Sequence, residues 1–250
     1  MKVSIITATY NSAASITASL NSVFSQDYKD IECIIIDGAS KDDTLPIIES
    51  YQRAYTNIKL VSEPDMGIYD ALNKGIAIAT GELIGFVHSD DILASPHIIS
   101  ELVLALKKTQ ASGVYGDLQY VSKLDTSKVI RYWKSGVFSK FLLKKGWMPP
   151  HPALFLKKEV YQKHGRFNLN YNIAADYDFM LRILKDNALK FIYLPKVIVK
   201  MRLGGASNKS LKNIIQKTKE DYRAITSNKI GNWITLILKN SSKIKQFLFK

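Results

Sequence analysis

The chain has 250 residues, of which 46% are hydrophobic, enough for a buried core in one large domain or two small ones. With 35 Lys and Arg residues against 22 Asp and Glu residues, it carries a formal net charge of +13 at pH 7. The single cysteine, Cys33, excludes a disulfide framework within one chain and favours a reducing compartment. Because no apolar run approaches the roughly 18–20 residues that span a bilayer, and the first residues alternate as a strand does, we expect a cytoplasmic protein.

The first hundred residues predict strands that alternate with helices. Runs rich in β-branched residues predict strands over residues 2–10, 31–38, 58–64 and 82–91. The segments between them place apolar residues at helical spacing, as in 16–26 and 67–80. Such a series builds a parallel sheet with right-handed crossovers, and its ligands collect at the carboxyl ends of the strands. We therefore expect an α/β fold with a ligand site at that edge.

Polar side chains stand at the end of all four predicted strands. Because the carboxyl ends of parallel strands meet at one edge of a sheet, these side chains are candidates for one shared site. They are Thr7, Thr9, Tyr10 and Asn11 after the first strand, Asp37, Gly38 and Ser40 after the second, Glu63, Asp65 and Gly67 after the third, and His88, Ser89, Asp90 and Asp91 after the fourth.

The middle of the chain predicts a change of structure. Residues 113–122 and 129–135 predict a strand and hairpin, and 138–152 an aromatic and basic loop in which two prolines make a rigid bend before His151.

The next segment predicts a helix around Asp176 and then a pair of strands over residues 191–203. Gly204 and Gly205 interrupt the chain, either as part of a lid or as an ordinary turn. One composite domain with a C-terminal appendage is the simplest organisation.

The C-terminal segment, from Ser207 to Lys250, has ten basic and two acidic residues mixed with large apolar ones. Nucleic acid or an anionic membrane surface each fits such a segment, and a solvated helix face is the simplest alternative. We favour an interfacial segment because apolar residues alternate with lysines over 231–250, and no nucleic-acid motif accompanies them.

Two adjacent carboxylates, Asp90 and Asp91, repel each other and are costly to bury, so they call for a compensating charge. The turn after the first strand, residues 7–15, has no glycine, which excludes the backbone cradle of a dinucleotide or P-loop site. A divalent cation held by carboxylates neutralises a diphosphate in another way. The structural alternative is that Ser-Asp-Asp begins a helix, where acidic residues are favourable.

Several stretches of the chain resemble the inverting family 2 glycosyltransferases of the bacterial surface-polysaccharide type, which have the GT-A fold. They are SIITATYNS, IIIDGASKDDT, SEPDMGIYDALNKGIAIATGELIGFVHSDD, HPALFLKKEVYQKHGRF, AADYDFMLRI and RLGGASN, in the family's order and covering about residues 2–208. The resemblance implies a Rossmann-like mixed, mainly parallel sheet flanked by helices. It implies a GT-A domain over 1–206, with a nucleotide-binding half (about 1–112) and an acceptor-binding half (113–206), followed by a basic amphipathic helical segment over 207–250.

The resemblance also implies a donor site for a nucleotide-diphosphate sugar, usually UDP-linked, with Mn²⁺ or Mg²⁺. Carried onto this chain, it places Thr7, Thr9 and Tyr10 around the base, Asp37 on the uracil or ribose, and Asp65 and Lys74 near the ribose and diphosphate. A plain turn role for Asp37 and a solvated helix face for Lys74 are the alternatives.

The family's metal motif, Asp-x-Asp, is partly kept here as His88-Ser89-Asp90-Asp91. We assign Asp91 as the metal ligand and Asp90 to the ribose or sugar. His88 is expected to be a structural partner of the acidic pair rather than a metal ligand.

The general base implied by the resemblance is Asp176, although Ala175 stands where the family often has glutamate. Asp178 is two residues further on and points to another face of the helix, so we expect a plain surface carboxylate. On the acceptor side we place Trp147 and His151. For His151 the alternative is a loop histidine packed on Trp147.

The leading hypothesis is an enzyme that transfers a sugar to a lipid-linked or growing polysaccharide acceptor at the inner face of the membrane. A sugar nucleotidylyltransferase would need a glycine- and arginine-rich loop after the first strand, which residues 7–15 lack. The alternative from another class is a catalytically silent nucleotide-sugar-binding or scaffold protein, suggested by Ala175 and the partial metal motif. No nucleic-acid partner is expected.

Overall fold

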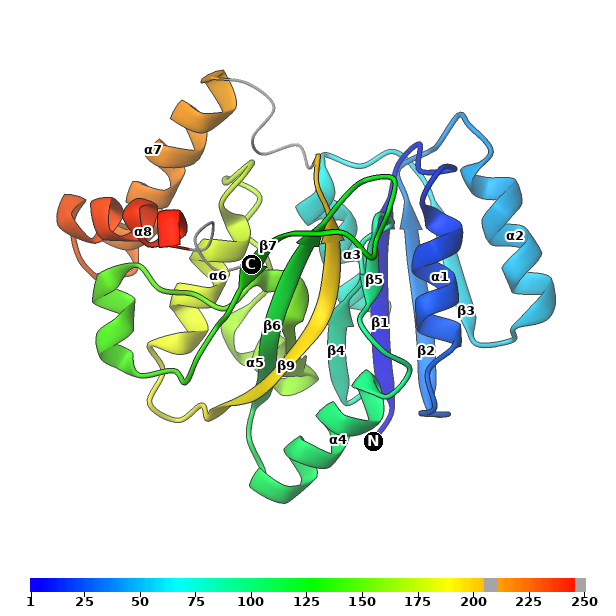
Figure 1. Cartoon of the computed structure of the whole chain (residues 1–250), viewed down its shortest axis with the longest axis horizontal. Helices are drawn as coiled ribbons and strands as arrows, with labels where there is room; N and C mark the ends of the chain where they lie inside the picture. Colours follow the sequence, from blue (N-terminus) through cyan, green and yellow to red (C-terminus); the bar gives the residue numbers. More distant parts are fainter. Residues whose placement is uncertain (205–210, 246–250) are drawn as a thin grey trace.

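A computed structural model describes residues 1–204 and 211–245 of the chain. Its described strands form one mixed sheet in the order β3-β2-β1-β4-β8-β6-β9-β5, with β7 paired to β6, and helices flank the sheet (Figure 1). This confirms the predicted α/β architecture. Gly205 and Ser207 lie outside the described residues, so the lid at the glycine pair and the division at residue 206 stay predictions.

The N-terminal half is a parallel sheet, as expected. Its strands are β1 (Val3–Thr9), β2 (Ile31–Asp37), β3 (Ile58–Ser62) and β4 (Leu83–Phe86). The connecting helices are α1 (Ile16–Phe24), α2 (Thr44–Ala54) and α3 (Ile68–Ile78). The register pairs Thr9 with Asp37 and Asp37 with Ser62, so the carboxyl ends of these strands lie side by side.

The central strand β1 is buried on both faces, which explains its run of apolar residues. Ile6 and Ala8 lie in one core cluster with residues of α3, whereas Val3 and Ile5 lie in another with residues of α4 (Ile98–Thr109). Helices therefore cover both faces of the sheet, and the loops at the carboxyl ends of the strands are left to form a site.

The second half of the sheet is built around β6 (Gly113–Val121). This strand pairs antiparallel with β7 (Val129–Trp133) and β8 (Leu154–Lys157), and parallel with β9 (Phe191–Arg202). Between these strands lie the 3-10 turns η1 (Lys140–Lys145) and η2 (His151–Ala153) and the helices α5 (Lys158–His164) and α6 (Ala175–Leu184). The predicted loop over 138–152 thus contains helical turns.

Two of the predicted strands differ from the structure. The strand predicted over 82–91 ends at Phe86, and Asp91 begins a new short strand, β5 (Asp91–Leu93), which pairs antiparallel with β9. The helix that follows, α4, begins only at Ile98, so Asp90 and Asp91 do not form its N-terminus, and the structural alternative was wrong.

The strand pair predicted over 191–203 was also wrong, because this segment forms one long strand, β9. Its register against β6 shifts between the pairs Tyr115–Tyr193 and Asp117–Val197, around the exposed Pro195. Proline cannot donate to a strand ladder, so an irregularity at this position is the expected response.

The C-terminal segment is helical, as predicted, with α7 (Leu211–Ser227) and α8 (Trp233–Lys245). Helix α7 packs against α6, and α8 packs against α7 and η1. At Gly146 (φ +73°) an added Cβ would lie 2.4 Å from the Cβ of Lys239, so this glycine lets α8 approach closely. Among the described residues, no helix has the length and apolar character needed to cross a membrane.

A buried carboxylate, Glu32, fixes the amino ends of the strands, away from the predicted site. Its carboxylate lies 3.2 Å from Lys2 Nζ and 3.1 Å from Lys59 Nζ, and it accepts hydrogen bonds from the backbone N–H groups of Thr80 and Gly81. Burial alone would raise the pKa of Glu32, but the hydrogen bonds and the lysine bring that pKa below its ordinary value of 4.5.

We expect Glu32→Gln to lower the free energy of unfolding at neutral pH by about 1–3 kcal/mol. Since the folded-state pKa lies below the unfolded one, the stabilisation is complete above about pH 4.5 and is lost as the pH falls below it. Urea unfolding between pH 3 and 7 should show the wild type and the variant converging in acid. The exposed Glu49→Gln on α2 is the control, and equal stability of both variants at pH 7 would contradict the role of Glu32.

Candidate functional site

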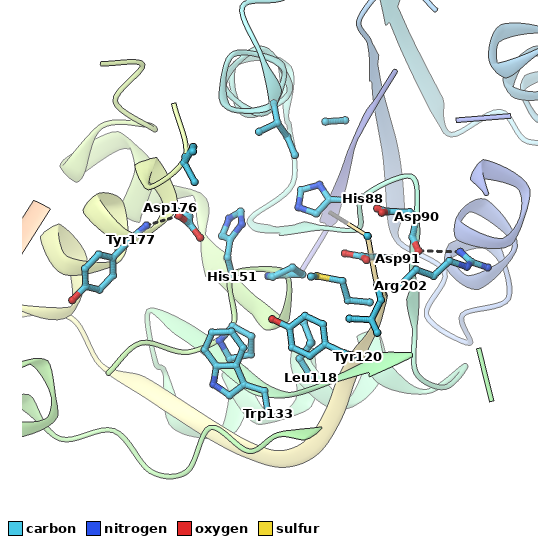
Figure 2. Close-up of a pocket in the computed structure, with 18 of the residues that line it drawn as sticks. His88, Asp90, Asp91, Leu118, Tyr120, Trp133, His151, Asp176, Tyr177 and Arg202 are labelled. Atoms are coloured by element: carbon cyan, nitrogen blue, oxygen red, sulfur yellow. Dashed lines mark hydrogen bonds between the residues drawn. The ribbon is translucent and has the colours of Figure 1, made fainter. Parts of the chain in front are cut away.

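A cleft of about 2070 Å³ lies at the carboxyl ends of the strands. It is lined by the loops that follow β1, β3 and β4, by β6 and β7, and by residues of α6, α7 and α8. Figure 2 shows His88, Asp90 and Asp91 on one side of this cleft and Asp176 and Tyr177 on the other. The cleft therefore joins residues that are far apart in the sequence.

The loops after β1 and β3 meet over Gly38, which follows β2. An added Cβ at Gly38 would lie 2.7 Å from Asp65 Oδ2 and 3.4 Å from the ring of Tyr10. Asp65 also accepts a hydrogen bond from the Gly67 N–H at 2.8 Å. Tyr10 is 59% exposed, whereas the Thr9 hydroxyl is buried without a partner. Thr9, Tyr10 and Asp65 line the cleft, and their contact with a base and ribose stays a prediction.

Three other residues predicted for the donor, Thr7, Asp37 and Lys74, do not line the cleft, and their contact with a nucleotide stays a prediction. Asp37 is fully buried, and its carboxylate accepts hydrogen bonds from the Ser40 N–H at 2.9 Å and the Ser62 hydroxyl at 2.7 Å. Thr7 is also fully buried. Through these contacts Asp37 stabilises the turn after β2, which is the structural alternative considered from the sequence.

Lys74 lies on α3 and is engaged by other side chains. Its Nζ lies 2.8 Å from Glu63 and 3.6 Å from Asp70, and it donates to the Pro64 carbonyl at 3.0 Å. Lys74 therefore braces the loop that carries Asp65.

The acidic pair has an unusual environment. Asp91 is fully buried, and neither of its carboxylate oxygens has a hydrogen-bond partner. Burial raises the pKa of Asp91 well above its usual range, Asp90 adds to this effect, and Arg202 opposes it. The Arg202 guanidinium, at the end of β9, donates to the Asp90 carbonyl at 2.9 Å (Figure 2). Arg202 is a residue of the site to which the sequence analysis gave no role.

A divalent cation fits this donor set. Asp91 has two buried oxygens without partners beside a second carboxylate, and hard cations prefer oxygen ligands. Within residues 1–204 and 211–245, no three His, Cys, Asp or Glu side chains are grouped closely enough to hold a metal by themselves. The remaining ligands would therefore have to come from a bound substrate and water, which is usual for Mg²⁺.

The two histidines of the cleft are expected to be neutral. Burial lowers the pKa of His88, against the charge of Asp90, and burial lowers the pKa of His151 to about 3. The His151 ring packs on Phe86 (centroids 4.9 Å apart) and Phe167 (5.3 Å), and its Nε2 has no hydrogen-bond partner. The His151 ring therefore packs on these two phenylalanines, and the alternative in which it packs on Trp147 was wrong.

Trp147 lines the cleft, and its assignment to the acceptor side stays a prediction. Its indole N–H donates to the Ser135 carbonyl at 2.9 Å, and its ring stacks on Phe138 with centroids 5.2 Å apart. A fixed aromatic ring of this kind can pack against the face of a sugar.

Asp176 lies in the first turn of α6 at the far side of the cleft from Asp91 (Figure 2). Its Oδ1 accepts the Tyr177 N–H at 2.8 Å and lies 3.1 Å from the Tyr69 hydroxyl. Burial raises the pKa of Asp176, and Lys239 is the largest opposing influence. A carboxylate whose pKa is raised holds a proton more firmly, which suits a general base.

Asp178 was expected at the surface, and this prediction was wrong. The residue is 4% exposed, its carboxylate lies 3.0 Å from Arg182 Nε, and it accepts a hydrogen bond from the Asn228 amide at 2.8 Å. It is absent from the lining of the cleft, which confirms that the two aspartates face different sides of α6.

The C-terminal helices bring charged residues to the site that the sequence analysis missed. Glu220 on α7 accepts the backbone N–H groups of Asn172 (3.1 Å), Ile173 (2.8 Å) and Ala174 (2.9 Å), and so fixes the loop in front of Asp176. Burial would raise the pKa of Glu220, but these N–H groups bring it below its usual value.

Lys239 on α8 also lines the cleft and is only 3% exposed. Its Nζ lies 2.6 Å from Asp221 and 3.4 Å from the centre of the Tyr177 ring. Burial lowers the pKa of Lys239 to about 8, against the effect of Asp221. The polar residues Thr235, Lys239 and Ser242 recur at helical spacing within an apolar segment, a pattern that could have indicated this face.

The family model of glycosyl transferase family 2 matches residues 4–185 of this chain. The chain belongs to glycosyl transferase family 2. A "PGL/p-HBAD biosynthesis glycosyltransferase" of Mycobacterium bovis (strain BCG / Pasteur 1173P2) is 30% identical over 208 residues, which are 82% of this chain and 78% of that protein. An uncharacterized glycosyltransferase of Mycobacterium tuberculosis (strain CDC 1551 / Oshkosh) is 36% identical over 183 residues, 72% of this chain and 68% of that one. This family 2 protein is thus a glycosyltransferase.

Solved structures of glycosyltransferases share its fold. Residues 1–349 of TarS from S. aureus, in complex with UDP-GlcNAc, superpose with a TM-score of 0.70 at 20% identity, covering 90% of this chain and 66% of that one. The mannosyltransferase PcManGT from Pyrobaculum calidifontis, in complex with GDP-Man and Mn²⁺, gives a TM-score of 0.65 at 18% identity, covering 90% and 63%. This glycosyltransferase spans less than two thirds of either chain. The likeness confirms the expected GT-A fold.

We expect Glu220→Ala to loosen the loop in front of Asp176, because three backbone N–H groups lose their acceptor. Hydrogen exchange should show the amides of Ile173 and Ala174 exchanging at least about tenfold faster, which corresponds to about 1.4 kcal/mol. The exposed Glu159→Ala on α5 is the control. Unchanged exchange in the Glu220 variant would show that the cap does not hold the loop.

Proposed function

We propose that this protein is an inverting glycosyltransferase that moves a sugar from a UDP-sugar to a hydroxyl of a lipid-linked or growing polysaccharide acceptor. The observation that carries the proposal is the placement of two different carboxylates in one cleft. Asp91, buried and without partners, suits the diphosphate end, and Asp176, whose pKa is raised, suits the acceptor end. The reaction is assigned to the cytoplasm, at the inner face of the cell membrane.

The donor nucleoside is assigned to the pocket over Gly38. The exposed ring of Tyr10 offers a surface on which a base can stack, and Asp65 offers an acceptor for ribose hydroxyls. The nucleotide sugar bound by TarS is UDP-GlcNAc and that bound by PcManGT is GDP-Man, so relatives in fold use both nucleotides. We assign UDP as the donor nucleotide, and a preference for UDP over GDP can be measured by binding.

Asp91 would hold Mn²⁺ or Mg²⁺ together with diphosphate oxygens, and Asp90 is assigned to the ribose or sugar. When bound, such an ion stabilises the negative charge of the departing diphosphate. Arg202, which donates to the Asp90 carbonyl, lies near Asp91 and adds a fixed positive charge at this end.

Asp176 acts as the general base in this mechanism. The acceptor oxygen attacks the anomeric carbon, its proton passes to the Asp176 carboxylate, and the bond from that carbon to the diphosphate oxygen breaks with its electron pair on the diphosphate. Attack from the face opposite the leaving group inverts the configuration, and no covalent intermediate is needed. Tyr69 and the Tyr177 N–H hold the carboxylate in place.

The alternative is a protein that binds nucleotide sugars without catalysis, for which Ala175 was the main argument. Ala175 is fully buried within the core cluster around α6, so a glutamate there could not enter the cleft without a change in packing. Its presence therefore says little against catalysis.

We expect Asp176→Asn to reduce kcat by about 100- to 10,000-fold, because the acceptor proton loses its base, while UDP-sugar binding changes little. Asp178→Asn is the matched control on the same helix. It should lower stability through its contact with Arg182 but leave kcat within about threefold. Rates with saturating donor, together with calorimetric UDP binding, test this. Near-normal turnover of Asp176→Asn would show that the base assignment is wrong.

We expect calorimetry with UDP, GDP and dTDP to show a preference for UDP that depends on Mn²⁺ and is lost in EDTA. Asp91→Ala should weaken UDP binding at least about tenfold with Mn²⁺ and have little effect in EDTA, because only the metal-dependent part is removed. The exposed Asp43→Ala at the start of α2 is the control. Metal-independent binding would disprove the role of Asp91, and a failure to bind any of the nucleotides would favour the silent alternative.

A further inference from the structure

Helix α8 packs Leu236 against the core but exposes four other large apolar side chains, unlike an ordinary surface helix. Such a helix normally buries its apolar stripe and exposes its polar one. Here Thr235 (4% exposed) and Lys239 (3% exposed) are buried. The exposed side chains form what we call the α8 face: Trp233 (60%), Ile234 (49%), Ile237 (52%) and Leu238 (41%).

This orientation is held by strong contacts. Lys239 Nζ lies 2.6 Å from Asp221 Oδ1 and over the Tyr177 ring, and its Cβ is close to Gly146. Rotating α8 to bury its apolar residues would break the ion pair and leave the buried Asp221 carboxylate with one lysine fewer. The exposure of the α8 face is therefore enforced by the structure.

The neighbouring turn η1 continues the same character. It packs against α8, and the two lie together at one end of the molecule in Figure 1. Phe141 on η1 is 64% exposed, with the Lys145 ammonium 4.8 Å from the centre of its ring, and Lys144 is exposed as well. Apolar side chains and ammonium groups are thus interleaved on this end.

The charge around the α8 face is positive. Residues 211–245 contain eight Lys and Arg residues and two acidic ones, Glu220 and Asp221. Both acidic side chains are buried and occupied by the contacts described above, so the exposed charge of these helices is basic. A second copy of this chain would bring the same positive charge to the interface and be repelled, whereas an anionic lipid surface would be attracted.

We propose that the α8 face docks this protein on a bilayer that carries anionic headgroups. Large apolar side chains with a tryptophan at the start of the helix, next to the exposed Lys144 and Lys145 of η1, are the composition of an interfacial surface. The opposite face of the same helix lines the cleft with Lys239 and Ser242. Docking would therefore place α8 between the lipid surface and the cleft, at a separation of one helix diameter, roughly 10–12 Å. That this position serves a lipid-linked acceptor rests on the proposed function.

The test is flotation of the full-length protein with vesicles of phosphatidylcholine, alone or with 30% phosphatidylglycerol, without donor or acceptor. The wild type should float with the anionic vesicles and bind neutral ones at least tenfold more weakly, and high salt should reduce binding. The double variant Ile237→Ser/Leu238→Ser should lose at least tenfold in affinity. Leu104→Ser on α4, which is 52% exposed on a different helix, is the matched control and should bind as the wild type does.

Several results would overturn the inference. They are equal binding of the double variant and the wild type, equal binding to neutral and anionic vesicles, or no binding at all. A dimer in sedimentation velocity that the double variant abolishes, without vesicle binding, would assign the α8 face to a second copy instead.

Calorimetric UDP binding separates this inference from the proposed function. The double variant should bind UDP as the wild type does, which also shows that it is folded. Vesicle binding without UDP binding would support the docking face and contradict the proposed function. UDP binding and sugar transfer without vesicle binding would support the proposed function and contradict the docking face.

Discussion

The site depends on one constraint of parallel sheets, which is that the carboxyl ends of neighbouring strands meet at one edge. Here β1, β2, β3 and β4 run in the same direction, and the register brings Thr9, Asp37 and Ser62 side by side. Glycine at position 38 then allows Asp65 and Tyr10 to close over the edge. Buried apolar residues on both faces of β1 hold this edge in place, so the geometry of the pocket over Gly38 follows from the core.

The cleft holds two carboxylates whose surroundings differ, and this difference separates their chemistry. Burial raises the pKa of both Asp91 and Asp176. Asp91 has no hydrogen-bond donor, and the charge of Arg202 does not offset its burial, so its ionised form needs a further positive charge. Asp176 has a backbone N–H and lies near Lys239, which keep its ionised form accessible while burial strengthens its hold on a proton. A cation site and a proton acceptor are what these environments suit.

Local pattern was enough to predict β1 and β2, because each is a short, mainly apolar run buried on both sides. It failed where pairing partners decide the structure. The apolar run before Asp91 gives no sign that the chain leaves β4 at Phe86 and pairs with β9 instead. The burial of Asp178 and Glu220 could not be predicted for the same reason. A carboxylate in a helix is expected to be solvated unless its partners on other elements are known.

The C-terminal helices α7 and α8 place charged residues near Asp176 whose burial the sequence alone does not predict. The net charge of α7 and α8 alone suggests a solvated tail, but several of their charged side chains are buried in contacts with the rest of the protein. Glu220, Asp221 and Lys239 are buried against α6, where they fix the loop and the charge around Asp176, and the apolar side chains of α8 are turned outward as a consequence. A helix that lines a cleft with its polar side can contact a hydrophobic surface only with the other side. The same ion pair that contributes to the environment of Asp176 therefore also keeps these apolar side chains of α8 exposed.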